Sequence, residues 1–184
     1  VTLAKNERRR LPMASTTKIM TALLTLEQPD LDAYFTVDAQ AIRVEGSSMG
    51  LREGDQVTLR ALAAGMLLSS GNDAAQAAAV SIDKSVEAFA KRMNGRAAEL
   101  GMEDTHFVTP SGLHDDEHYS TAADMALLAR SALQNEAFVS ICSKSSMKLS
   151  FGNPPFDRWL KNHNRLLKEY EGCIGMKTGF TKKA

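Results

Sequence analysis

The sequence predicts a globular protein of helices and short strands, and three observations lead to this prediction. First, 43% of the 184 residues are apolar, which is enough to fill one good hydrophobic core. Second, several segments carry apolar residues at helical spacing, including residues 19–26. Third, short segments that alternate apolar and polar side chains, such as residues 147–151, are typical of strands. We expect residues 1–184 to form a single domain with two lobes.

The first predicted helix begins at Ser15, and its apolar stripe ends before the turn formed by residues 28–30. Residues 1–4 alternate like the last part of a strand. Short strands are expected at residues 35–37 and 56–59, and helices at residues 60–69, 73–79 and 85–100.

Residues 102–119 read as a loop that contains His114 and His118. Two histidines four residues apart can bind a metal on a helix, but a loop lacks a fixed face, so we favour solvated side chains and predict no metal site. After this loop we expect a helix capped by Ser120 and a shorter helix at residues 136–141. A hairpin at residues 147–160 and a glycine-interrupted strand at residues 173–180 follow.

The charge balance and the cysteines exclude several other classes of protein. Lys+Arg and Asp+Glu number 22 each, so nothing indicates nucleic acid or an anionic membrane as the main partner. No run reaches the roughly 18 apolar residues of a spanning helix. Cys142 and Cys173 fit neither a metal cluster nor a disulfide-rich scaffold, and free thiols are the default interpretation.

Ser15 and Lys18 form a candidate nucleophile and base. Residues three apart on a helix share a face, so the Lys18 amine can reach the Ser15 hydroxyl. The positive end of the helix dipole disfavours an ammonium and favours a developing oxyanion, which suits acyl transfer. By itself the pair is weak evidence, because a capping serine and an exposed lysine are common in helices.

Two further motifs strengthen this hypothesis. Ser70-Gly71-Asn72 lies at the junction of two predicted buried helices, where polar side chains need partners or a function. Lys177-Thr178-Gly179 brings a cation, a hydroxyl and a bare backbone N–H to one edge, which is a suitable clamp for a carboxylate. The three motifs in this order are found in penicillin-binding proteins and class A β-lactamases.

The segments around these motifs resemble the low-molecular-mass D-alanyl-D-alanine carboxypeptidases. The similar stretches are residues 12–22, 69–75, 101–107 and 175–181. The resemblance implies an α+β, β-lactamase-like fold, in which a helical cluster packs on an antiparallel sheet that includes the strand at residues 173–180. It also implies a chain truncated at both ends, without most of the first strand, the strands and helix after the last motif, and a membrane-anchoring extension.

The resemblance further implies a role for each motif residue. Ser15 would attack the carbonyl between two D-alanines, and Lys18 would act as the base once burial and Lys177 lower its pKa. Ser70 would pass a proton to the leaving amine, and Asn72 would bind the substrate amide.

The last motif would bind the substrate's carboxylate and stabilise the reaction's oxyanion. Lys177, Thr178 and Gly179 would hold the terminal carboxylate. The backbone N–H groups of Ser15 and Phe180 would form the oxyanion hole.

The expected partners are peptidoglycan stem peptides and, as covalent inhibitors, β-lactams. The resemblance implies action outside the cytoplasm, at the periplasm or the outer face of the membrane. Any membrane contact would come from the missing C-terminal extension, and no cofactor is expected.

Two alternatives stay open. A class A β-lactamase would deacylate with a loop glutamate in a Glu-x-x-Leu-Asn pattern, which the chain lacks. A non-catalytic module that only binds peptidoglycan or β-lactams is the other alternative, and the presence of every chemical residue argues against it.

Overall fold

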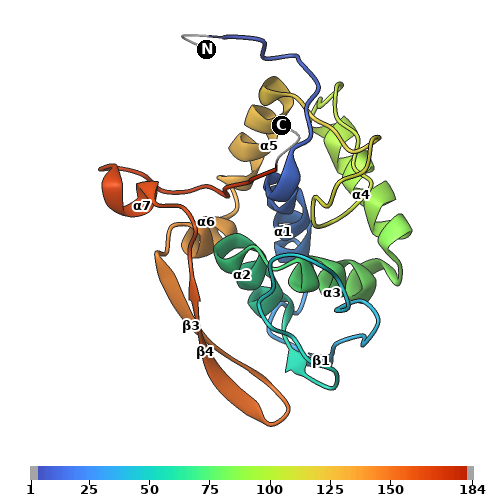
Figure 1. Ribbon diagram of the computed structural model, residues 1–184, viewed down its shortest axis with the longest axis vertical. Coiled ribbons are helices and arrows are strands. Elements are labelled where there is room, and N and C mark those ends of the chain that lie inside the picture. Colours follow the sequence, from blue (N-terminus) through green and yellow to red (C-terminus); the bar gives the residue numbers. More distant parts are fainter. Residues whose placement is uncertain (1–3, 182–184) are drawn as a thin grey trace.

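Helix α1 (Lys18–Leu26) lies at the centre of the structure, and all of its residues are buried. The structure is a computed structural model that describes residues 4–181. A 3₁₀ turn, η1 (Ala14–Thr17), leads directly into α1. Around α1 pack the helices α2 (Leu59–Ser69), α3 (Asn72–Asp83), α4 (Val86–Glu99), α5 (Ala122–Ala132) and α6 (Glu136–Cys142), as Figure 1 shows.

Polar side chains fix where four of these helices begin. Thr58, Ser85, Thr121 and Asn135 each accept a hydrogen bond from the backbone N–H three residues further on, which satisfies a donor left free by the first turn. The prediction that Ser120 caps α5 is wrong by one residue. The Ser120 hydroxyl instead bonds the Thr105 hydroxyl at 2.7 Å, which leaves the cap to Thr121.

The strands form two separate antiparallel pairs in the described part of the chain. Strands β1 (Phe35–Thr36) and β2 (Gln56–Val57) make a short ribbon, and β3 (Ser146–Gly152) pairs with β4 (Pro155–Lys161) in the predicted hairpin. The hairpin projects beside α2 and α6, next to the short helix α7 (Leu166–Glu169) (Figure 1). Helices around α1 with antiparallel ribbons at their side confirm the α+β class.

The predicted strand at residues 173–180 is wrong, because no described residue pairs with this segment in a ladder. A strand is defined by a neighbouring backbone, which alternation and glycines in the sequence cannot supply. The segment instead runs from α7 back to the N-terminal end of α1 (Figure 1). The predicted strand at residues 1–4 lies outside the described residues, apart from Ala4, which is not in a strand.

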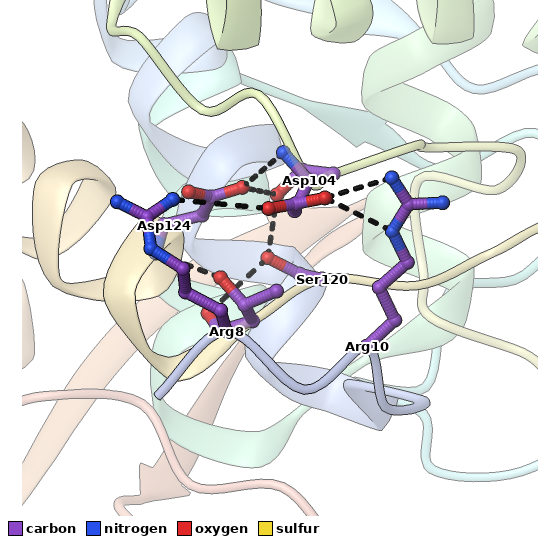
Figure 2. A network of polar contacts seen from close by, with 7 residues as sticks. Arg8, Arg10, Asp104, Ser120 and Asp124 are labelled. Atoms are coloured by element: carbon purple, nitrogen blue, oxygen red, sulfur yellow. Dashed lines mark hydrogen bonds and ion pairs between the residues drawn. The ribbon is translucent and has the colours of Figure 1, made fainter. Parts of the chain in front are cut away.

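A polar network holds the chain that enters η1 (Figure 2). The Arg10 guanidinium donates two hydrogen bonds to Asp104, at 2.7 and 3.1 Å. The backbone N–H of Asp104 donates to buried Asp124 at 2.8 Å, which connects this pair to α5. Leu11 and Ser120 exchange two backbone hydrogen bonds nearby. The position of the Ser15 turn is therefore set by contacts with the loop before α5 as well as by α1.

Candidate active site

Ser15 and Lys18 meet as their spacing predicts. Lys18 Nζ lies 3.0 Å from Ser15 Oγ and donates a second hydrogen bond, of 2.6 Å, to the carbonyl of Ser111. Ser15 lies in the 3₁₀ turn η1, so the prediction that it sits in the first turn of an α-helix is wrong. A 3₁₀ turn has three residues per turn, so positions i and i+3 still share a face. The serine and the lysine are thus in hydrogen-bond contact.

Two glycines allow other segments to approach this turn closely. A Cβ at Gly112, whose φ is +81°, would collide with the Ala14 carbonyl. A Cβ at Gly179 would lie 3.0–3.2 Å from Thr16 and from the Met13 carbonyl. Because both sides of η1 are in such close contact, any side chain at either glycine would displace the turn.

The loop before α5 holds α1 through a buried histidine. His118 Nδ1 accepts the backbone N–H of Val108 at 2.9 Å, so its proton resides on Nε2, which donates to Thr17 Oγ1 at 2.8 Å. Thr21 Oγ1 donates to the carbonyl of Pro110 at 2.6 Å. His118 is only 3% exposed, so the prediction of a solvated side chain is wrong for it. Burial lowers the pKa of His118 to about 4.

The Lys18 amine is poised to lose its proton near neutral pH. Burial and, to a smaller extent, the charge of Lys177 together lower the pKa of Lys18 to about 7, and Asp73 opposes this shift. Burial lowers the pKa of Lys177 to about 8. As pH rises, Lys18 loses its proton first, while Lys177 is still charged. The repulsion between the two amines therefore lowers the pKa of Lys18 and not that of Lys177. Between these values Lys18 is neutral and Lys177 positive.

Ser70 and Asn72 form the junction between α2 and α3, as predicted. Ser70 ends α2 in the left-handed conformation, with φ of 61°. Asn72 begins α3, and its Nδ2 donates to the Glu45 carbonyl at 2.7 Å while its backbone N–H donates to Ser47 O at 2.7 Å. The side-chain amide N–H of Asn72 therefore holds the loop at residues 45–51. Its contact with a substrate stays a prediction.

Asp73 holds the same loop, and the sequence analysis missed it. Its carboxylate accepts the Ser48 hydroxyl at 2.6 Å and the backbone N–H groups of Met49, Gly50 and Leu51 at 2.9–3.0 Å. It is 2% exposed. The only local signal was an acidic residue in the first turn of a helix, which is too common to be diagnostic.

Lys177 and its neighbours form the opposite side of the site. Lys177 is 8% exposed, and its Nζ donates to the carbonyl of Thr178 at 2.5 Å. The carbonyl of Met176 accepts a hydrogen bond from Asn164 Nδ2 at 3.2 Å. The Phe180 side chain is 84% exposed.

Each of the three motifs contributes to the lining of one pocket of about 320 Å³, although Lys18 and Asn72 do not line it themselves. Its lining consists of Ser15, Ser47, Ser70, His163, Lys177, Thr178, Gly179 and Phe180. Four hydroxyl-bearing residues, a cation and backbone N–H groups converge there, which suits acyl transfer to serine from a substrate that bears a carboxylate. A larger hollow of about 530 Å³ also borders Gly179 and Phe180, but it contains neither Ser15 nor Lys177.

Ser47 and His163 are pocket residues that the sequence analysis did not identify. Cys142 and Cys173 are free thiols, as predicted, and burial raises the pKa of Cys142 to about 11. Among residues 4–181, no cluster of three or more His, Cys, Asp or Glu side chains is arranged to hold a metal ion. Within the same residues, no helix has the length and apolar character needed to cross a bilayer.

A family model described as D-alanyl-D-alanine carboxypeptidase matches residues 1–184. The D-alanyl-D-alanine carboxypeptidase DacF of Bacillus subtilis (strain 168) is 39% identical over 185 residues, a match that covers 98% of this chain and 47% of that protein. DacB2 of Mycobacterium tuberculosis is 37% identical, with 94% of this chain and 59% of that protein covered. The chain therefore spans about half the length of these relatives.

Solved structures agree with these matches. The Streptomyces K15 DD-transpeptidase superposes with a TM-score of 0.92 at 33% identity, over 99% of this chain and 76% of that one. A D-alanyl-D-alanine carboxypeptidase from Mycobacterium tuberculosis H37Rv superposes with a TM-score of 0.91 at 34% identity, over 98% and 69% of the two chains.

Proposed function

The chain belongs to the D-alanyl-D-alanine carboxypeptidase family, and from its pocket we propose a serine-type D-Ala-D-Ala carboxypeptidase that trims peptidoglycan stem peptides. The observation that carries this proposal is the buried Lys18 amine, 3.0 Å from Ser15 Oγ and with a pKa of about 7. A lysine that is neutral near pH 7 can accept the proton of a serine hydroxyl. We also propose that residues 1–184 belong to one catalytic domain.

Acylation begins at Ser15. Its Oγ attacks the carbonyl carbon between the two D-alanines and passes its proton to neutral Lys18. The negative charge that develops on the carbonyl oxygen is stabilised by the backbone N–H groups of Ser15 and Phe180, a donor pair typically worth about 3 kcal/mol or more per member. Both residues line the same pocket, which supports this assignment.

The C–N bond then breaks, and the leaving amine takes up a proton that Lys18 supplies through the Ser70 hydroxyl. Free D-alanine departs and leaves an ester on Ser15. Water hydrolyses the ester, with Lys18 taking a proton from the water and returning one to Ser15. This sequence of steps consumes one water and regenerates the enzyme.

The remaining residues position the substrate. Lys177 and Thr178 hold its terminal carboxylate, and Gly179 lets the segment approach the Ser15 turn closely enough to do so. Asn72 contacts the peptide backbone through the side-chain oxygen that its bond to Glu45 leaves available. β-Lactams mimic the D-Ala-D-Ala end and acylate Ser15. Because peptidoglycan lies outside the cytoplasmic membrane, we place the site of action there.

Mass spectrometry tests the assignment. Benzylpenicillin should add its mass to the purified protein, and Ser15→Ala should take up none. The wild-type protein should release D-alanine from diacetyl-Lys-D-Ala-D-Ala, while the penicilloyl adduct should persist because no loop glutamate assists its hydrolysis. An adduct that survives Ser15→Ala would refute the nucleophile. Hydrolysis of penicillin faster than of the peptide would favour a β-lactamase.

A further inference from the structure

The turn between β4 and α7 presents His163 to the pocket and is built by the asparagines on either side of it. Asn162 Nδ2 donates to the carbonyls of Cys142 and Lys144, at 3.1 and 3.0 Å. Its Oδ1 accepts the backbone N–H of Asn164 at 2.9 Å. Both ends of the turn are therefore fixed by side-chain hydrogen bonds, and these hold the backbone of the histidine between them.

The same turn connects the two sides of the pocket. The backbone N–H of His163 donates to Leu68 O at 3.3 Å, near the end of α2 that carries Ser70. Asn164 is 6% exposed, and its Nδ2 donates to the carbonyl of Met176, which directly precedes Lys177. His163 therefore lies where the Ser70 side and the Lys177 side of the pocket meet.

The imidazole of His163 is exposed and lines the pocket together with Ser15, Ser70 and Lys177. It makes no hydrogen bond with the other residues that the structure describes. An imidazole carries an N–H donor in both its neutral and its charged form. This donor, unused among residues 4–181, is therefore available to a ligand in the pocket.

In the reaction proposed above, the leaving D-alanine occupies this region, with its amine near Ser70 and its carboxylate at Lys177. A carboxylate has two oxygens with about four acceptor positions, and it is held best by several donors. Lys177 Nζ already donates to the carbonyl of Thr178, so not all of its N–H groups are free for the substrate. His163 can supply a further donor to this carboxylate from the α2 side of the pocket.

We propose that His163 is a further substrate-binding residue that donates a hydrogen bond to the carboxylate of the leaving D-alanine. This inference rests on the proposed carboxypeptidase function. It assigns to His163 a part in recognising the free C-terminus and no part in proton transfer. Its loss should weaken binding of substrates that end in a carboxylate and spare substrates whose terminus is blocked.

The test compares His163→Ala, His163→Gln and, as a matched control, Lys161→Ala, an exposed residue of β4 that does not line the pocket. Two peptides serve as substrates: diacetyl-Lys-D-Ala-D-Ala and its C-terminal amide. For His163→Ala we expect kcat/KM to fall about tenfold on the free peptide, through KM, because a charge-assisted hydrogen bond is lost. On the amide, the change should stay within about twofold. His163→Gln keeps an N–H donor and should recover part of the loss, and Lys161→Ala should behave as wild type.

Thermal unfolding of each variant checks that the fold is intact. Equal losses on the two peptides, or no loss on either, would overturn the role of His163 while leaving the carboxypeptidase function in place. A wild-type protein that releases nothing from either peptide would overturn the proposed function and this inference together.

Discussion

The two sides of the pocket are held in different ways. The nucleophile side is anchored in the helical core: Lys18 is completely buried and donates to the Ser111 carbonyl, and Thr17 bonds to His118. The Lys177 side is a segment without a strand partner in the described part of the chain. It is held by hydrogen bonds from Asn164 to the Met176 carbonyl and from Cys142 to the Ile174 carbonyl, and by the close approach of Gly179 to η1.

This difference matches the different roles proposed for the two sides. Groups that move protons tolerate little displacement, because a shift of about 1 Å can lower the rate by on the order of a hundredfold. Such groups lie in the core, where packing fixes them. Groups that bind one end of a substrate lie on the less embedded side. Changes on the nucleophile side should therefore affect every substrate equally, and changes on the Lys177 side should depend on the substrate.

The largest effect is expected for Lys18→Ala, which removes the proposed base. Acylation should slow by about a thousandfold or more, since general base catalysis typically contributes 10²–10⁴. The loss should be the same for the free peptide, the amide and benzylpenicillin, because every acylation needs the Ser15 proton removed. Stopped-flow acylation and D-alanine release measure it. Losses that differ between these substrates would contradict a purely chemical role for the lysine.

The buried His118, which bonds to Thr17 beside the nucleophile turn, should make the stability of the protein depend on pH. The pKa of folded His118 is about 4, below the ordinary 6.5, so the unfolded chain binds a proton between these values that the folded chain does not. The free energy of unfolding should therefore decrease as pH falls from 6.5 to 4, by about 3 kcal/mol from this residue. His118→Asn keeps an acceptor near Val108 and cannot titrate, so it should remove this part of the slope. Urea unfolding at several pH values measures it, and an unchanged slope would contradict the assignment.

On the other side, Lys177→Ala should lower kcat/KM by some tens of fold for the free peptide, by loss of a charge-assisted contact. The C-terminal amide should lose only a few-fold, because the positive charge has no carboxylate to bind. D-Alanine and D-alaninamide release, followed on the same preparation, gives both values. If kcat/KM fell as much for the amide as for the free peptide, Lys177 would act in the reaction itself and not only in binding the carboxylate.

Local spacing made part of the site predictable. Ser15 and Lys18 are three residues apart, so their contact survives the change from an α-turn to a 3₁₀ turn. The helices around the core were found because their apolar spacing is also local. A glycine within an extended segment often marks the close approach of another backbone, and Gly179 makes such an approach to η1.

The predictions that were wrong or missing concern residues whose contacts are far away in the sequence. His118 looked like a solvated loop residue because Thr17, which it bonds, is 101 residues away. Asp73 holds a loop more than 20 residues earlier in the chain. The strand expected at residues 173–180 lacked a pairing partner among the described residues, which no local pattern can reveal. Periodicity reports which face of a segment is apolar, and it does not report what lies against that face.

The smallest expected effect is in the pH dependence of kcat/KM, which involves both sides of the pocket. For the free peptide, Lys18 must be neutral and Lys177 charged, so kcat/KM should rise toward a pKa of about 7 and fall above a pKa of about 8. Each limb changes by about tenfold per pH unit. Cleavage of the C-terminal amide needs no charge on Lys177. Its pH profile of kcat/KM should therefore keep the rising limb and lose most of the falling one.

Lys177→Ala sharpens this comparison, because the positive charge of Lys177 is one cause of the lowered pKa of Lys18. Without it, Lys18 should hold its proton to higher pH, and the rising limb for the amide should move in the alkaline direction. The variant thus separates two roles of Lys177. The carboxylate contact sets the ratio of the kcat/KM values for the free peptide and the amide. The electrostatic effect sets the pH at which the rising limb of the profile lies. A rising limb that stays in place would mean that burial alone lowers the pKa of Lys18, and that the two sides of the pocket act independently.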